Sequence, residues 1–142
     1  MKRIMVFMVI AGVIFILPFA LHAQTAAELE AVLGTQVVTC AQAAMFVCAG
    51  SATFEEVVAK GWLKNSSPDD PITMGKLSLL MMKAFNMKGG MMYSITKAPR
   101  YAYRTMVSRN FIQGASDPAM TVSGERFLLI LGKVLSAEGE KL

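Results

Sequence analysis

Few side chains in this 142-residue sequence have the chemistry of a catalytic centre. The single histidine, His22, lies in an apolar segment at the start of the chain, so residues 24–142 have no imidazole for a general base or a zinc ligand. Asp69 and Asp70 are adjacent, but two carboxylates without further acidic residues at metal-loop spacing suit turn and cap roles better than a calcium site. We therefore expect a non-enzymatic protein with no catalytic residue, bound metal or cofactor.

Cys40 and Cys48 are the only cysteines in the sequence. If one continuous helix carries both, eight residues of rise separate them by about 12 Å. A disulfide requires Cα atoms within about 7 Å. The spacing favours two small buried thiols, and the alternative is a bridge made through a broken helix or between chains.

Basic and aromatic residues cluster between positions 93 and 109. The members are Tyr93, Lys97, Arg100, Tyr101, Tyr103, Arg104 and Arg109. Such a mixture combines charge contacts with flat stacking surfaces for a sugar or an anionic polymer, and Arg100 and Arg104 share one face of the expected helix. The alternative is a solvated face whose long side chains extend into water.

The composition leaves room for one domain and argues against a nucleic-acid-binding protein. Apolar residues make up 54% of the chain and charged residues 17%, with a net charge of +4. Lys2 and Arg3 lie in the first segment, which leaves 12 basic and 10 acidic side chains in the rest. That balance is far below the charge density of a nucleic-acid-binding surface.

The first 23 residues are typical of a secretory signal peptide. A cationic start, Lys2 and Arg3, precedes an apolar run from Ile4 to Leu17, and Pro18 breaks the run before a cut after Ala23. We therefore expect an extracytoplasmic protein of the periplasm or cell envelope. The alternative is an uncleaved signal anchor, because residues 4–23 span about 20 positions, enough to cross a bilayer.

The rest of the chain has the apolar spacing of helices and almost no alternation typical of strands. We expect an all-α domain over residues 24–136 and a flexible tail over residues 137–142. The predicted helices cover about residues 26–33, 39–47, 73–87, 99–110 and 123–136, with a further helix that begins at Ser51 or Thr53 and ends near residues 61–63.

A helix-loop-helix unit recurs along the domain. Gly61-Trp62-Leu63, a loop and Ile72-Thr73 correspond to Asn110-Phe111-Ile112, a loop and Val122-Ser123. After the two hydroxyl caps, Lys76 corresponds to Arg126. A weaker copy begins at Val38-Thr39.

This pattern resembles the S-layer homology (SLH) motif over residues 38–135. The resemblance implies three motifs packed around an approximate threefold axis and non-covalent binding to a cell-wall polymer. The motif usually carries an arginine directly after the hydroxyl cap, which holds an anionic, often pyruvylated, glycan. Cys40, Met74 and Gly124 occupy that position here.

We therefore expect a cell-envelope protein that binds cell-wall glycan or peptidoglycan. The candidate ligand-binding residues are Trp62, Lys76, Arg100, Arg104 and Arg126. From the first turn of their helices Lys76 and Arg126 could project toward a groove, and the alternative is that both are simply solvated. The alternative is a periplasmic interaction or adaptor module that presents methionine-rich and basic surfaces to an envelope protein. No membrane contact is expected beyond a retained signal anchor.

Overall fold

The computed structural model describes residues 26–141 of the chain. These residues form helices joined by loops, and two isolated β-bridges are the only strand-like pairing within them. The predicted all-α class is therefore confirmed. The expected signal peptide, residues 1–23, lies outside the described residues. Within the described part, no helix has the length and apolar character needed to cross a membrane.

The chain divides into two compact units, with the boundary between Gly34 and Thr35. This boundary falls inside the segment 24–136 that the sequence predicts as one domain. In the described part of the first unit, residues 26–33 are helical, as predicted. The Gly34 amide donates to the Glu30 carbonyl (3.2 Å) and ends that helix.

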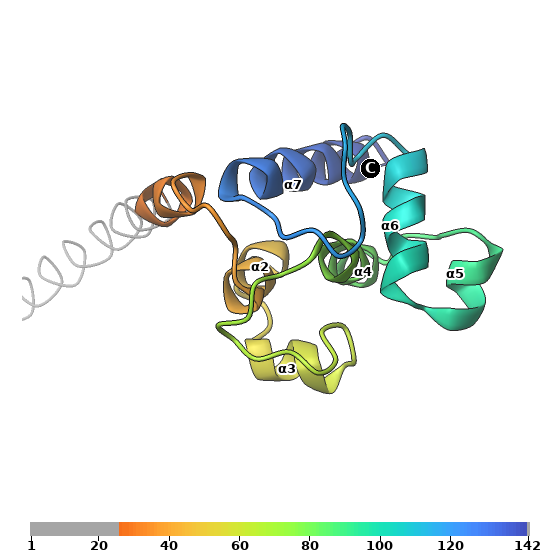
Figure 1. Ribbon diagram of the computed structural model, residues 1–142, viewed down its shortest axis with the longest axis horizontal. Coiled ribbons are helices and arrows are strands. Elements are labelled where there is room, and N and C mark those ends of the chain that lie inside the picture. The colour runs from red at the N-terminus through yellow and green to blue at the C-terminus, as the bar shows by residue number, and fades with distance from the viewer. Residues whose placement is uncertain (1–25, 142) are drawn as a thin grey trace, which may run out of the picture. The chain divides into compact units, whose positions relative to one another are not determined.

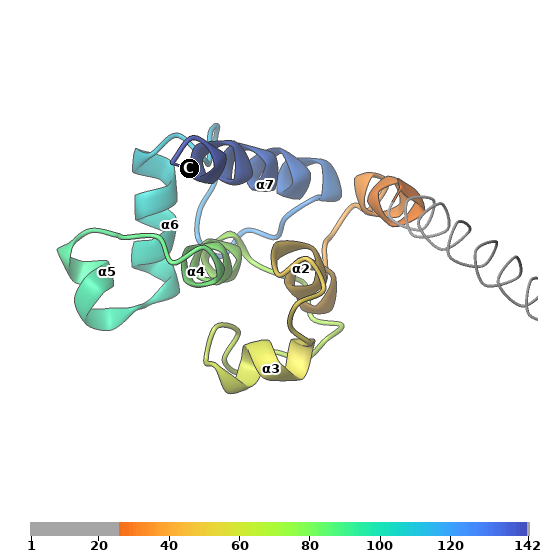
Figure 2. The ribbon, with the colours of Figure 1, turned by 180° about the vertical axis from the view of Figure 1, so that it is seen from behind.

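The second unit contains the helices that position the candidate site. They are α2 (Cys40–Val47), α3 (Phe54–Ala59), α4 (Met74–Ala84), α5 (Met91–Thr96), α6 (Pro99–Ser108) and α7 (Gly124–Gly139). Helix α4 lies between α2 and α6 and below α7 (Figure 1), and Figure 2 shows the same arrangement from behind. Helix α5 was not predicted from the sequence.

Helix α7 is longer than expected. It continues to Gly139, through residues assigned to a flexible tail of 137–142. Ala137 and Glu138 are good helix formers, and adding them to an existing helix requires no new nucleation. The tail prediction treated charge and polarity as a sign of disorder, although both are compatible with the solvent side of a helix.

Side-chain caps start the three helices that open the expected repeats. Each capping oxygen accepts a hydrogen bond (3.3 Å) from the backbone amide three residues later. The pairs are Thr39 with Gln42, Thr73 with Lys76, and Ser123 with Arg126. Each cap satisfies an amide that the helix itself leaves unpaired.

Backbone hydrogen bonds join the segments that precede α2, α4 and α7. The Val38 amide donates to the Val122 carbonyl (2.8 Å), and the Ile72 amide donates to the Val38 carbonyl (2.9 Å). The Met74 amide donates to the Met120 carbonyl (2.8 Å), which links the second segment to the third. Val38, Ile72 and Val122 are completely buried. We call this set of crossing segments the hub.

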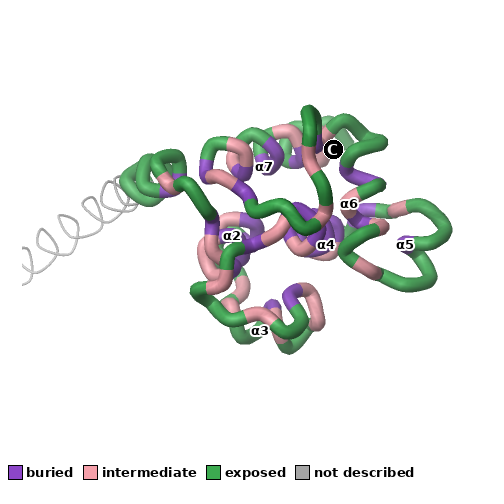
Figure 3. Tube along the Cα trace, viewed as in Figure 1, coloured by how far each residue is buried: buried purple, intermediate pink, exposed green. Residues whose placement is uncertain are grey.

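The apolar core is concentrated along α4. Leu77, Leu80 and Met81 have no exposed surface, and Figure 3 shows most of α4 buried while α5 and its flanking turns are mostly exposed. Phe46 of α2 lies at the edge of this core and is only half-buried. Its ring meets the buried Phe127 edge-on at 6.1 Å between centroids, because Phe127 occupies the deeper position.

Candidate functional site

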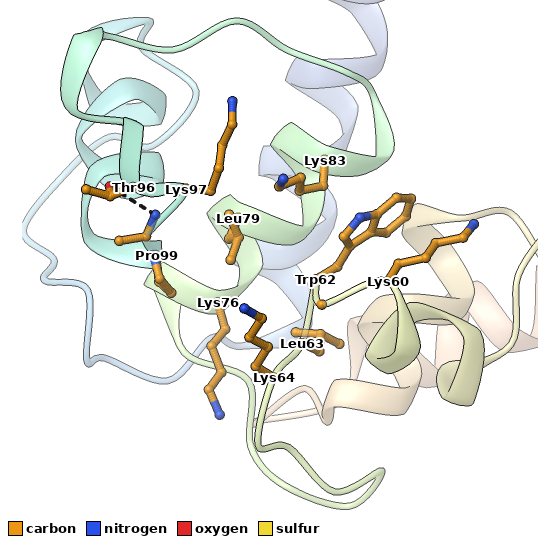
Figure 4. Close-up of a pocket in the computed structure, with 12 residues that line it drawn as sticks. Lys60, Trp62, Leu63, Lys64, Lys76, Leu79, Lys83, Thr96, Lys97 and Pro99 are labelled. Atoms are coloured by element: carbon orange, nitrogen blue, oxygen red, sulfur yellow. Dashed lines mark hydrogen bonds between the residues drawn. The ribbon is translucent and has the colours of Figure 1, made fainter. Parts of the chain in front are cut away.

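A cavity of about 520 Å³ lies where the turn after α3, the helix α4 and the loop between α5 and α6 meet. Lysines are its most frequent lining residues. They are Lys60, Lys64, Lys76, Lys83 and Lys97. Trp62 and Leu79 supply apolar surface, and Figure 4 shows these side chains around the cavity. We call this cavity the lysine hollow.

The turn after α3 sets the position of Trp62. Helix α3 ends at Ala59 with Lys60 as its C-cap, and Gly61 then adopts a positive φ of 77° that reverses the chain direction. The Trp62 amide donates to the Val57 carbonyl (3.1 Å), and the next residue, Leu63, is buried in the core. Because its neighbours are anchored, Trp62 stays half-exposed at the wall of the hollow.

The ammonium groups of the hollow are not neutralised by carboxylates. Within residues 26–141, the only salt bridge joins Lys141 to Glu138, remote in sequence from these lysines. Lys64 and Lys83 extend toward the space beside Leu79 in Figure 4. The ammonium of Lys60 lies 4.9 Å from the centre of the Trp62 ring, a cation-π contact. The hollow therefore combines positive charge with a flat aromatic surface.

Lys76 and Arg126 do not project freely toward a groove. Lys76 lines the hollow, but its Nζ donates to the Ser66 hydroxyl (2.8 Å) and turns away from the cavity in Figure 4. Arg126 donates from Nη2 to the Gln113 carbonyl (2.9 Å). Each cation thus holds the loop that precedes its own helix, which corrects the sequence-based expectation.

The five predicted binding residues do not form one site. Trp62 and Lys76 line the lysine hollow, whereas Arg100 is exposed on α6 and Arg126 lies at the start of α7. Arg104 lines a second, more open cavity of about 570 Å³ between α5 and α6. Its guanidinium lies 5.8 Å from the centre of the Tyr101 ring. We call this second cavity the α5–α6 hollow.

Sequence reasoning missed most of the lysine hollow. Lys60, Lys64 and Lys83 were not proposed, and Lys97 was assigned to the basic and aromatic cluster. One signal was available on α4, because Lys76 and Lys83 are seven residues apart and therefore share a helix face. The lysines of the other two elements are brought to that face only by the tertiary fold.

The two cysteines are free and buried, as the spacing predicted. Burial raises the pKa of the Cys40 thiol above its ordinary value, although Lys76 and a hydrogen bond with Ser66 act in the opposite direction. Burial likewise raises the pKa of Cys48. Thiols held in the neutral form are poor nucleophiles and poor metal ligands. In the described part of the chain, no cluster of three or more potential metal-ligating side chains is found.

Comparisons with family models, curated proteins and solved structures gave no match to this chain. What the site can bind is therefore argued from its own geometry and charge. The lysine ammonium groups and the Trp62 ring suit a ligand that has both a negatively charged group and a flat face.

Proposed function

We propose that this chain is a non-catalytic cell-envelope protein that binds an anionic cell-wall polymer, a glycan or peptidoglycan, in the lysine hollow. The observation that carries the proposal is that five lysines line one cavity with Trp62. None of them forms an ion pair within residues 26–141, and only the ammonium of Lys76 is held by a neighbouring hydroxyl. Ammonium groups attract carboxylates and phosphates. The indole ring of Trp62 offers a flat apolar face against which a sugar ring can pack.

The proposal includes an SLH-like architecture of three helix-loop-helix units around an approximate threefold axis. Corresponding backbone hydrogen bonds support it. The Cys40 amide donates to the Asp70 carbonyl (2.8 Å) and the Met74 amide to the Met120 carbonyl (2.8 Å). In both cases the acceptor lies two residues before the buried β-branched residue of the next unit, Ile72 or Val122.

The following residue of each helix repeats the correspondence. The Ala41 amide donates to the Pro68 carbonyl (3.0 Å) and the Gly75 amide to the Pro118 carbonyl (2.9 Å), each four residues before Ile72 or Val122. The third unit departs slightly from this register. There the Gly124 amide donates to the Thr35 carbonyl (2.8 Å), three residues before Val38.

The proposed binding mode differs from the one that the resemblance implies. The position after each cap, where the motif usually has arginine, holds Cys40, Met74 and Gly124, and all three are buried. These residues cannot contact a polymer at the surface. In this proposal, lysines from the turn after α3, from α4 and from the loop before α6 supply the positive charge instead.

Sedimentation of the purified protein with isolated cell-wall sacculi tests the proposal. The double variant Lys64→Gln, Lys83→Gln is expected to weaken association by at least about tenfold, because each lost contact between an ammonium and an anion is worth that order of affinity. Rising salt should weaken the parent protein in the same way. Thermal stability should not change, since neither lysine has an ionic partner within the described residues.

The matched control is Lys88→Gln, Lys133→Gln, which removes the same charge from positions that do not line the lysine hollow. This control should retain wall association. Equal loss in the two double variants would mean that only net charge matters and would refute the site. Absence of any sedimentation at low salt, with the protein folded, would refute wall binding and favour the alternative role as an envelope-protein adaptor.

A further inference from the structure

Helix α5 presents apolar side chains to solvent. Met91 is 78% exposed, Met92 45% and Ile95 71%. Because Met91 and Ile95 are four residues apart, they lie on the same face of the helix. We call these three residues the α5 tip. At the edge of the molecule in Figure 1, α5 lies beside α6, its main helical neighbour.

A buried tyrosine holds the α5 tip outward. Tyr93 is 2% exposed, and Gly89 approaches its ring so closely that a Cβ there would lie 2.3 Å from the Cδ1 atom. Lys97 then ends the helix in the left-handed conformation, with a φ of 51°. Tyr93 is therefore the side chain that packs this short helix against the rest of the protein. Met91, Met92 and Ile95 do not enter the core.

Cations surround the α5 tip, and acidic residues are absent from this stretch of the sequence. From Pro71 to Ser116 the chain has seven basic residues and no aspartate or glutamate. Arg104 and Arg109 line the same α5–α6 hollow as Met91 and Met92. The ammonium of Lys97 lies 4.6 Å from the centre of the Tyr93 ring.

We propose that the α5 tip docks on the surface of an anionic lipid bilayer. Met91, Met92 and Ile95 enter the boundary between headgroups and acyl chains, and Lys97, Arg104 and Arg109 contact lipid phosphates. Shallow burial of apolar side chains together with basic residues above an anionic surface is a stable interfacial arrangement.

The chemistry of the surface favours lipid over a protein partner. Only three apolar side chains are exposed at the α5 tip, whereas a stable protein interface typically buries about 800 Å² on each partner. No acidic side chain lines the α5–α6 hollow, so nothing there would pair with the basic groups of a mixed protein surface. A bilayer of anionic lipid presents negative charge over the whole contact area and hydrocarbon just beneath it.

A local fluorescence measurement tests this inference on the full chain. An environment-sensitive fluorophore is attached to a cysteine introduced by Ile95→Cys, and separately by Leu129→Cys on α7, where the parent leucine is 59% exposed. Cys40 and Cys48 are buried, and the unsubstituted chain measures any labelling of them. With vesicles of phosphatidylcholine and phosphatidylglycerol, the probe at position 95 should shift to the blue and the probe at position 129 should not.

A second set of measurements tests whether binding requires negative charge on the lipid and positive charge on the protein. Vesicles of phosphatidylcholine alone should give little response at position 95. The variant Arg104→Gln, at a residue that does not line the lysine hollow, should weaken binding to the anionic vesicles by about fivefold, because each basic residue near an anionic surface strengthens binding by about that factor. The hollow variant Lys64→Gln, Lys83→Gln should leave the response unchanged, so this inference can fail or succeed independently of wall binding.

The remaining outcomes overturn the inference. No shift at position 95 with anionic vesicles would mean that the α5 tip does not enter a bilayer. Equal shifts at positions 95 and 129 would mean that contact is made by another part of the chain or without orientation. An equal response to neutral vesicles would refute the role assigned to Lys97, Arg104 and Arg109.

Discussion

Two glycine-to-alanine substitutions should change stability in opposite directions. Both Gly75 and Gly132 lie inside helices, where alanine is intrinsically favoured by about 1 kcal/mol. Gly132 is exposed on α7, and a Cβ added there would have no atom within 4 Å. We therefore expect Gly132→Ala to raise the free energy of unfolding by about 1 kcal/mol.

Gly75 is buried at the hub, where the added methyl group has no space. Its Cβ would lie 3.1 Å from the Pro118 carbonyl oxygen and 3.3 Å from the Pro99 Cβ. That oxygen accepts the hydrogen bond from the Gly75 amide itself (2.9 Å), and both neighbours belong to rigid proline residues. Overpacking of this kind costs about 1–3 kcal/mol. Over most of that range the cost is larger than the gain of about 1 kcal/mol in helix propensity.

Urea denaturation followed by circular dichroism measures both free energies. Gly75→Ala should lower the free energy of unfolding by up to about 2 kcal/mol and the midpoint of thermal unfolding by several degrees, while Gly132→Ala raises both. If Gly75→Ala is as stabilising as Gly132→Ala, then the loop carrying Pro118 yields easily. That result would refute the claim that close packing of α4 against the segment before α7 determines stability.

Two further predictions concern the core and the thiols. Leu80→Ala should lower the free energy of unfolding by about 2–5 kcal/mol because it leaves a cavity in a fully buried site, whereas Leu129→Ala on the exposed face of α7 should change it by less than about 1 kcal/mol; similar losses in urea denaturation would contradict the assignment of faces. Because burial raises the pKa of Cys40 and Cys48 above 9.0, the folded state keeps protons that the unfolded state loses, and stability should fall as pH rises past that value. Replacing both cysteines by alanine should reduce this alkaline decline, measured by urea titrations from about pH 8 to about pH 10, and an unchanged slope would argue against neutral buried thiols.

The helix starts could be predicted because their signals are local. Thr39, Thr73 and Ser123 each stand directly before a run of apolar residues at helical spacing, and each accepts the amide hydrogen bond that such a position favours. Pro99 likewise marks the start of α6. These features depend on a few neighbouring residues and require no knowledge of the tertiary fold.

Helix α5 lacked such signals. Its N-cap is Gly90, without a side-chain hydrogen bond, and it is only six residues long. Tertiary packing of Tyr93 holds it in place. No residue close in sequence indicates that contact. The segment between the predicted helices 73–87 and 99–110 was therefore expected to be a loop.

The candidate site was harder to predict than the fold. Long cationic side chains have several rotamers, and helix position alone did not reveal that Arg126 would turn back to the Gln113 carbonyl or Lys76 to Ser66. Lys64 reaches the hollow from a turn far in sequence from Lys97. Lys64 and Lys97 line the same cavity because of how α4 packs between its neighbours. The spacing of residues along the chain does not predict that packing.

The hub has a consequence for the order of events during synthesis. The Val38 amide is paired with the Val122 carbonyl and the Thr35 carbonyl with the Gly124 amide, so the segment before α2 is completed by residues near the end of the chain. Until those residues leave the ribosome, the early segments have unpaired backbone groups at the place where the finished molecule is most tightly joined. Closing a loop of that length is also slow compared with forming single helices. The nascent chain should therefore remain largely unfolded throughout translation. It should become resistant to proteases in one step, after α7 has been synthesised.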